Sequence, residues 1–125
     1  MAELNAIGIV ASDTARSIAF YRLLGVEFPE EGEGHVEATL RSGIRLMLDA
    51  EEVVKSFRPD WERASGNQLA LAFRCGSPGE VDETYARVVA AGFRGEKEPW
   101  DAFWGQRYAQ LADPDGIPVD LYAPL

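Results

Sequence analysis

The hydrophobic residues follow two different periods along the chain, and the period predicts the type of each element. Residues 4–10 form a short apolar run that is rich in β-branched side chains, which is typical of a buried strand. From residue 14 to Leu24 apolar residues recur every three or four positions, which predicts an amphipathic helix. Ser12 or Asp13 can cap the start of this helix, and Gly25 is its expected stop.

Strand-like alternation returns in the next segment. Residues 35–40 and 44–49 flank the short loop Arg41 to Gly43, and the glycine suits the turn of a hairpin. Residues 50–66 combine helix formers with Pro59 and then with small polar residues. They therefore predict a short helix followed by a connector.

The same order of elements begins again in the second half. Residues 67–73 predict a strand, residues 77–80 form a capping box for a second helix, and Gly92 is the expected stop. Residues 107–113 and 117–123 predict two strands around a tight Asp-Gly turn. Residues 98–104 show neither period, so we predict a connector there, which holds Trp100, Phe103 and Trp104.

The two capped helices and their glycine stops lie about half a chain length apart, which indicates an internal duplication. We predict an α+β fold of two βαβββ modules whose curved mixed sheets surround a cleft. Module one covers about residues 1–62 and module two about residues 63–125, within a single domain of residues 1–125.

Composition and charge narrow the possible partners. The net charge of −9 disfavours nucleic acid and anionic membrane surfaces, and no apolar run approaches the length of a membrane span. The charge suits a cationic ligand, but an acidic composition far more often reflects solubility alone. Cys75 is the single cysteine and cannot form an internal disulfide, so we expect a cytoplasmic protein.

Three segments carry a resemblance to a known family. They are SDTARSIAFYRLLGVEF after the first strand, ARVVAAGF in the second half, and WGQRYAQLADPDGIPVDLY at the end. In this order the chain resembles the glyoxalase/bleomycin-resistance/dioxygenase group, also called the vicinal oxygen chelate superfamily. The resemblance spans essentially the whole chain and implies paired βαβββ modules.

The resemblance also implies where a metal would be held. The ligand positions of the family's metal-dependent enzymes fall on Ala6, near Leu46 or Met47, on Gln68 and on Asp120. Only Asp120 is a good ligand, and the chain has one histidine, whereas catalytic zinc, nickel or iron sites often use at least two. We therefore predict no metal and no other cofactor. Magnesium or manganese held mainly by oxygen ligands is the alternative.

Alternation also assigns one face of each strand to the cleft. In the last strand Val119 and Leu121 belong to the core, which leaves Asp120 and Tyr122 on the cleft face. This face is either a small-molecule pocket or a solvated sheet surface. The predicted ligand-binding residues on this face and in the aromatic connectors are Trp100, Phe103, Trp61, Trp104, Glu37, Asp49, Met47, Gln68, Tyr108, Asp120 and Tyr122.

Several of these residues have two possible roles. Trp104 lies in the motif WGQR and is also a candidate for holding the fold, whereas Trp100 and Phe103 are the better candidates for stacking on a ligand. His35 is either an ordinary exposed strand residue or a general base.

These observations predict a homodimeric, metal-free protein that sequesters a small aromatic or cationic compound, resembling the bleomycin-resistance type of antibiotic resistance protein. The alternative is a lyase, isomerase or dioxygenase with an atypical site, in which Asp120, Glu37 or His35 transfers a proton. A third hypothesis is a degenerate domain that serves interaction alone.

Overall fold

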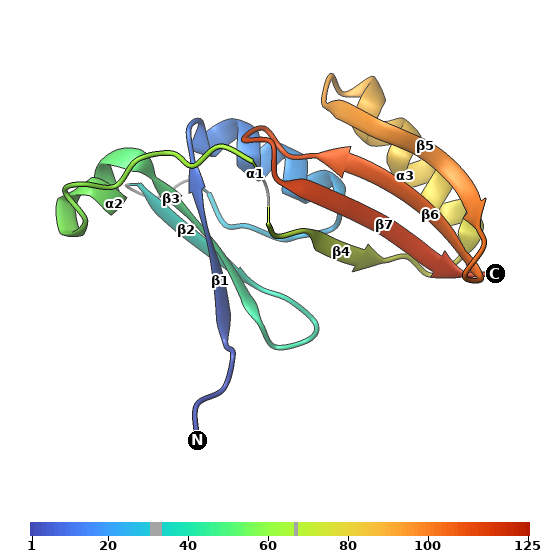
Figure 1. Ribbon diagram of the computed structural model, residues 1–125, viewed down its shortest axis with the longest axis horizontal. Coiled ribbons are helices and arrows are strands. Elements are labelled where there is room, and N and C mark those ends of the chain that lie inside the picture. The colour runs from blue at the N-terminus through green and yellow to red at the C-terminus, as the bar shows by residue number, and fades with distance from the viewer. Residues whose placement is uncertain (31–33, 67) are drawn as a thin grey trace. The chain divides into compact units, whose positions relative to one another are not determined.

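A computed structural model describes residues 1–30, 34–66 and 68–125, and it divides into two compact units. Unit 1 is Met1–Ala64 and unit 2 is Ser65–Leu125. Figure 1 shows the elements of both units in chain order.

Unit 1 contains a three-stranded mixed sheet with the order β1-β3-β2. β1 (Ala6–Ala11) pairs in parallel with β3 (Arg45–Ala50), and β2 (His35–Thr39) pairs with β3 in antiparallel orientation. Helix α1 (Thr14–Leu23) connects β1 to the segment before β2 and packs against β3. Helix α2 (Glu51–Phe57) follows β3 directly.

Local sequence signals set the ends of α1 as predicted. The side chain of Asp13 accepts a hydrogen bond from the Arg16 N–H at 3.1 Å, which satisfies one of the free donors of the first turn. Gly25 follows the helix at φ +92°, a conformation that side chains with a Cβ rarely adopt. The predicted strand alternation is also confirmed, because Leu46 and Leu48 are buried while Met47 between them is not.

Unit 2 contains a four-stranded mixed sheet with the order β4-β7-β6-β5. β4 (Leu71–Arg74) pairs in parallel with β7 (Pro118–Pro124), and β6 (Gln106–Ala112) pairs in antiparallel orientation with β7 and with β5 (Arg94–Ala102). Helix α3 (Pro78–Ala90) packs on β5, β6 and β7, as Figure 1 shows.

Ser77 caps α3 as predicted, and the reciprocal bond of the capping box comes from Gly76, one residue before the cap, instead of from Ser77. Ser77 Oγ accepts the Glu80 N–H at 3.1 Å, and the Glu80 carboxylate accepts the Gly76 N–H in return. Val81 and Val88 are fully buried, and Thr84 completes the buried stripe. Val89 lies beside this stripe and is exposed.

The sequence prediction was wrong for β5. Residues 98–104 were expected to form a connector, but residues through Ala102 belong to this nine-residue strand. The charged sequence with Pro99 obscures the strand pattern, and the edge position of β5 tolerates it because one side of an edge strand needs no hydrogen-bonded neighbour. Register shifts on both sides of Lys97 further mask the alternation.

The start of β4 and the order of elements in unit 1 also differ from the prediction. The strand predicted from residue 67 begins at Leu71, so Gln68 is an exposed residue ahead of the strand, and Asn67 lies outside the described residues. Unit 2 has the order βαβββ, whereas the described part of unit 1 has βαββ followed by α2. The fold class is α+β with two mixed sheets, as predicted. No helix in the described residues is long and apolar enough to span a membrane.

Candidate functional site

The sheet of unit 2 has one apolar face and one aromatic and polar face. Along β7 the residues Val119, Leu121 and Ala123 are buried on the side that α3 covers. Asp120 and Tyr122 alternate with them and therefore lie on the opposite face, as predicted. The strand register extends this face across the sheet, because Tyr108 of β6 is opposite Tyr122 and Trp100 of β5 is opposite Tyr108.

Four aromatic rings on this face and in the adjoining turn form a continuous group, which we call the aromatic cluster: Trp100, Trp104, Tyr108 and Tyr122. Tyr108 is its centre, with ring centroids 5.5 Å from Trp100, 5.3 Å from Trp104 and 6.3 Å from Tyr122. The Tyr108 and Tyr122 rings are stacked, while both tryptophans meet Tyr108 edge to face. The structure therefore brings together four of the predicted ligand-binding residues.

A buried carboxylate adjoins the aromatic cluster. Asp120 is 9% exposed, and its Oδ2 accepts the Tyr108 hydroxyl at 2.6 Å. Its other oxygen, Oδ1, has no hydrogen-bond partner among the described residues. Burial, followed by the hydrogen bond to Asp120, raises the pKa of Tyr108 to about 12. Tyr108 therefore stays protonated near neutral pH and acts as a donor.

Two polar contacts show how the tryptophans interact with their own chain. The Lys97 ammonium lies 3.9 Å from the centroid of the Trp100 ring, which is a cation–π contact. The Trp104 indole N–H donates to Gln106 Oε1 at 2.8 Å. The face of Trp100 thus already attracts a cation, and Trp104 is held by a hydrogen bond within the hairpin.

Other predicted residues lie outside the aromatic cluster. Phe103 is 97% exposed at the tip of the β5–β6 turn, where its ring meets only Trp104 among the described ring contacts. Gln68 lies ahead of β4. Trp61 follows α2 in unit 1, and the Arg63 guanidinium lies 5.4 Å from its ring centroid. The sequence placed these side chains at one site because Phe103 and Trp61 were predicted in connectors and Gln68 in a strand that began at residue 67.

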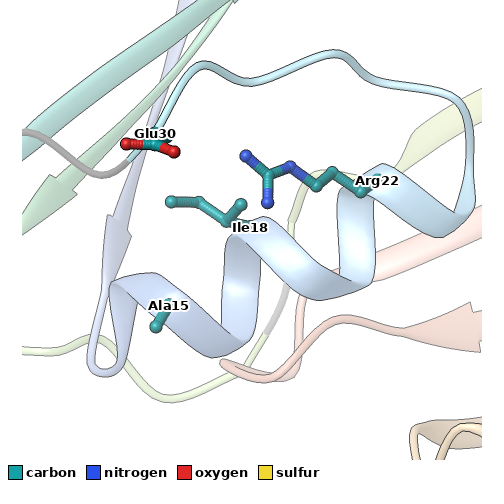
Figure 2. A pocket seen from close by; sticks show the side chains of 4 residues that line it. All are labelled: Ala15, Ile18, Arg22 and Glu30. Carbon is teal, nitrogen blue, oxygen red and sulfur yellow. The ribbon is translucent and has the colours of Figure 1, made fainter.

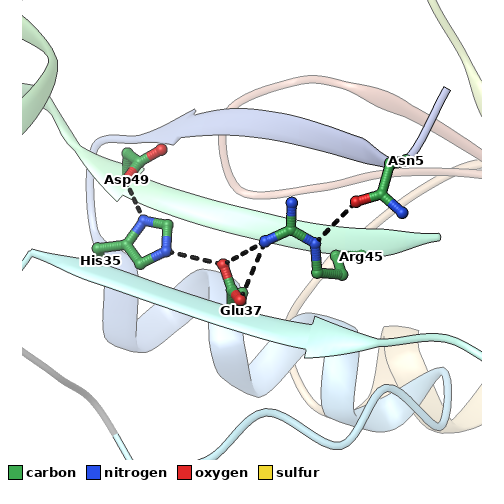
Figure 3. A network of polar contacts seen from close by, with 5 residues as sticks. All are labelled: Asn5, His35, Glu37, Arg45 and Asp49. Carbon is green, nitrogen blue, oxygen red and sulfur yellow. Dashed lines mark hydrogen bonds and ion pairs between the residues drawn. The ribbon is translucent and has the colours of Figure 1, made fainter. Parts of the chain in front are cut away.

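The predicted residues Glu37 and Asp49 belong to a charged network on the sheet of unit 1, which Figure 3 shows. His35 Nδ1 lies 2.5 Å from Asp49 Oδ1, and His35 Nε2 lies 3.0 Å from Glu37 Oε2. Arg45 Nη1 contacts both Glu37 oxygens at 3.1 Å, and Arg45 Nε donates to Asn5 Oδ1 at 3.2 Å. Strand pairing creates the network, because His35 is opposite Asp49 in the β2–β3 register.

The network changes the protonation of its members. Hydrogen bonds to Asp49 and Glu37 raise the pKa of His35 above its usual 6.5. The hydrogen bond from His35, followed by that from Arg45, lowers the pKa of Glu37. His35 is an exposed strand residue, as one of the two interpretations predicted, but both of its ring nitrogens are occupied by carboxylates. A free ring nitrogen, which a general base requires, is therefore missing from this arrangement.

A separate hollow of about 400 Å³ lies beside α1 in unit 1. Figure 2 shows Ala15, Ile18 and Arg22 along α1, with Glu30 in the following segment. Arg22 Nη2 donates to the carbonyl oxygens of Phe28 and Pro29 at 3.0 and 3.2 Å. The Arg22 guanidinium thus holds the loop after α1. None of the predicted ligand-binding residues is among those that line this hollow.

The residues at the metal positions implied by the family resemblance do not fit a metal ion. Ala6 has no donor atom, Leu46 is buried in the core and Met47 offers only a thioether. Gln68 lies outside the strand, and Asp120 alone supplies a carboxylate. In the register of unit 1, Ala6 is opposite Arg45, whose fixed positive charge opposes a cation. Among the described residues no group of three histidine, cysteine or acidic side chains is arranged for a metal.

The fold and this face define an α+β protein of two sheet-and-helix units with an aromatic, carboxylate-bearing sheet surface. The family model described as the Glyoxalase/Bleomycin resistance protein/Dioxygenase superfamily matches residues 3–121, and the chain belongs to this superfamily. The resemblance predicted from the three sequence segments is thereby confirmed.

Similar proteins cover almost the whole chain. The uncharacterized protein YaeR of Escherichia coli (strain K12) is 30% identical over 128 residues, which cover 96% of this chain and 95% of YaeR. A glyoxalase/bleomycin resistance protein/dioxygenase family enzyme from Burkholderia phytofirmans PsJN has a TM-score of 0.87 at 21% identity and covers 99% of this chain and 100% of that one. A lactoylglutathione lyase from Agrobacterium tumefaciens has a TM-score of 0.70 at 21% identity, covering 98% and 94%. These structures support the fold.

Proposed function

We propose that this protein binds a small aromatic or cationic compound on the aromatic cluster, without a metal ion, and sequesters it in the manner of the bleomycin-resistance branch of its superfamily. The observation that carries the proposal is the cluster itself, four rings adjoining the buried carboxylate of Asp120. Aromatic rings beside a few polar groups are typical of small-molecule sites.

The chemistry of the face favours a flat or positively charged ligand. Each aromatic pair that a ligand ring makes contributes about 0.5–1.5 kcal/mol beyond the burial of its area. A ligand cation over an indole adds about 0.5–1 kcal/mol at an exposed site, and Lys97 already occupies such a position on Trp100. The net charge of −9 adds a general attraction for cations.

Isothermal calorimetry with 2-(2-naphthyl)ethylamine as the probe tests this proposal. We expect Trp100→Leu to weaken binding about tenfold, because that factor corresponds to about 1.4 kcal/mol, which the loss of one to two ring contacts of about 0.5–1.5 kcal/mol each can supply. Trp61→Leu is the matched control, because Trp61 lies in the other unit and outside the aromatic cluster. Equal affinity of the Trp100→Leu variant and the wild-type chain would reject the aromatic cluster as the binding surface.

The second candidate function is catalysis by an atypical lyase, isomerase or dioxygenase. The Tyr108–Asp120 hydrogen bond of 2.6 Å favours it, since paired acidic groups can move a proton. Turnover of an α-ketoaldehyde thiol adduct or of a catechol, lost in Asp120→Asn, would support catalysis over sequestration. The high pKa of Tyr108 favours binding, because a hydroxyl that titrates at about 12 is a poor proton donor near neutral pH.

We also propose that the chain forms a homodimer in the cytoplasm. Cys75 is the single cysteine and is buried, which is consistent with a reducing compartment. Light scattering coupled to size exclusion tests the dimer, whose mass would be twice the chain mass of 13.7 kDa. A mass equal to that of one chain would contradict it.

A further inference from the structure

We propose that Trp104 and Tyr108 form a one-electron relay: a small oxidising radical that reaches Trp104 produces a neutral tyrosyl radical at Tyr108, whose proton moves to Asp120. This activity goes beyond ligand binding, since it uses only side chains of unit 2 and requires no bound compound. Three features carry the proposal. They are an exposed indole, a half-buried phenol beside it, and a carboxylate that accepts the phenolic hydroxyl.

Trp104 is the surface end of the relay. It is 49% exposed in the β5–β6 turn, so a small radical reaches its ring from solvent. The indole N–H donates to Gln106 Oε1 at 2.8 Å, and an amide oxygen accepts a hydrogen bond without removing the proton. The neighbouring Phe103 is more exposed, but its ring is far harder to oxidise than an indole. The oxidant therefore takes its electron from Trp104.

The rings of Trp104 and Tyr108 are in contact, which suits direct electron transfer between them. Their centroids are 5.3 Å apart, and the rings meet edge to face. Trp100 contacts both rings, with centroids 6.1 Å from Trp104 and 5.5 Å from Tyr108. The Lys97 ammonium, however, lies 3.9 Å from the Trp100 centroid, and its charge opposes a second positive charge on that ring. The direct step from Tyr108 to Trp104 is therefore favoured over a route through Trp100.

The hydrogen bond between Tyr108 and Asp120 supplies the proton acceptor that oxidation of a phenol requires. A phenol that loses an electron becomes a strong acid, so its oxidation is favoured when its proton leaves at the same time. The Tyr108 hydroxyl donates to Asp120 Oδ2 at 2.6 Å, which is within the reach of a positioned base. Asp120 is 9% exposed, and burial favours the neutral acid that it becomes. Tyr122 also stacks on Tyr108, but among the described residues no carboxylate accepts the Tyr122 hydroxyl.

The relay balances in electrons and protons. The radical takes one electron from the Trp104 indole and leaves as its anion. The Trp104 radical cation then takes one electron from Tyr108, while the Tyr108 O–H bond breaks and its proton forms a new O–H bond on Asp120 Oδ2. The indole is restored, Tyr108 is oxidised by one electron to a neutral radical, and the Asp120 carboxylate becomes a carboxylic acid.

Pulse radiolysis of the full chain with the azide radical tests the relay, because this small neutral radical takes electrons from indole rings in preference to other side chains. Transient absorption follows the conversion of the indole radical to the tyrosyl radical, and EPR of freeze-quenched samples identifies the product. We expect Tyr108→Phe to lose the tyrosyl signal. Asp120→Asn should slow the conversion about a hundredfold, since a positioned base contributes about 10²–10⁴-fold. It should also remove the slowing that the wild-type chain shows in D₂O.

Trp104→Phe keeps a ring in the turn but removes the oxidisable entry point. We expect it to slow formation of the tyrosyl radical about tenfold, which corresponds to a barrier about 1.4 kcal/mol higher for the remaining route through Trp100. Tyr85→Phe is the matched tyrosine control, because Tyr85 lies on α3 outside the aromatic cluster. Trp61→Phe is the matched tryptophan control in unit 1. Both controls should keep the wild-type rate constant. Circular dichroism and the Tm of each variant establish that it is folded.

The relay is supported by a tyrosyl signal that is absent in Tyr108→Phe, forms slowly in folded Asp120→Asn and Trp104→Phe, and is unchanged in Tyr85→Phe and Trp61→Phe. The absence of a tyrosyl signal in the wild-type chain, or an equal signal in a folded Tyr108→Phe variant, would overturn it. A wild-type rate in Asp120→Asn or in Trp104→Phe would overturn it as well, because the proton acceptor or the entry point would then be unused.

Discussion

At the scale of single residues, His35 shows how strand pairing changes a side chain's chemistry. The sequence allowed two roles for it, a general base or an exposed strand residue. Its partners Glu37 and Asp49 lie on β2 and β3, and Arg45 holds Glu37 from the other side. The network therefore stabilises a protonated imidazole on the surface of unit 1 rather than a free base.

This arrangement predicts a pH dependence of stability. Because the carboxylates raise the pKa of His35, its protonation stabilises the folded chain. The contribution is complete below the unfolded pKa of about 6.5 and is lost as the pH rises through the raised folded pKa. At low pH the wild-type chain should therefore have a higher Tm than His35→Gln. This difference in Tm should disappear as the pH rises through the raised pKa of His35. Glu37 has a lowered pKa, so its ionised carboxylate also stabilises the folded chain. This stabilisation is lost at acidic pH, as the pH falls through the lowered pKa of Glu37.

The chain has a single histidine, so one imidazole signal in a proton NMR titration measures this pKa directly. Asp49→Asn is the informative variant, because the hydrogen bond to Asp49 is the largest cause of the shift. It should lower the titration midpoint. A wild-type midpoint at or below 6.5 would contradict the network.

At the scale of elements, the β5–β6 hairpin divides the aromatic residues that the sequence presented as one stretch. Trp100 belongs to β5 and contacts Tyr108 across the strand pair. Trp104 lies in the turn, is 49% exposed and contacts three other aromatic rings. Phe103 at the tip is almost fully exposed. The three residues therefore have different expected roles in the same hairpin.

We expect Trp104→Ala to lower the free energy of unfolding by about 1–2 kcal/mol, since aromatic pairs contribute about 0.5–1.5 kcal/mol each and part of the ring is solvated. The hydrogen bond from its indole to Gln106 is lost as well. Phe103→Ala in the same turn is the control and should change stability by less than about 0.5 kcal/mol, as exposed positions usually do. Urea denaturation measures both values. The opposite ranking would mean that Trp104 does not hold the hairpin.

At the scale of the whole molecule, the chain carries the α+β fold of its superfamily but lacks side chains that suit the implied metal positions. Of those positions only Asp120 is a carboxylate, and Arg45 is opposite Ala6. The superfamily fold thus positions an aromatic face and a buried carboxylate without the donor set for a catalytic zinc, nickel or iron.

This predicts that chelation leaves the folded protein unchanged. A resident metal at a concentration of 100 times its Kd would stabilise the chain by about 2.7 kcal/mol, and its removal would lower Tm by roughly 8 °C. We expect EDTA to change the Tm of the protein, purified without chelators, by less than about 1 °C. Elemental analysis is the companion measurement. Near-stoichiometric zinc, nickel, iron or manganese together with a fall in Tm would contradict the prediction.

The sequence by itself determined the features that depend on neighbouring residues. The caps of α1 and α3, the glycines at φ +92° that follow them, and the alternation along β3 and β7 were predicted correctly, because each is set within a few positions of the chain. The family resemblance also came from local segments and is confirmed by the match over residues 3–121.

Only the tertiary structure decided which residues meet across strands. The edge strand β5 forms despite its charges and Pro99 because β6 pairs with it, and no local pattern encodes that pairing. The His35 network likewise depends on the β2–β3 register, and Tyr108 reaches Asp120 because β6 pairs with β7. The unpaired Oδ1 of Asp120 follows from the same pairing, since burial and the lack of a partner are properties of the packed sheet rather than of the residue.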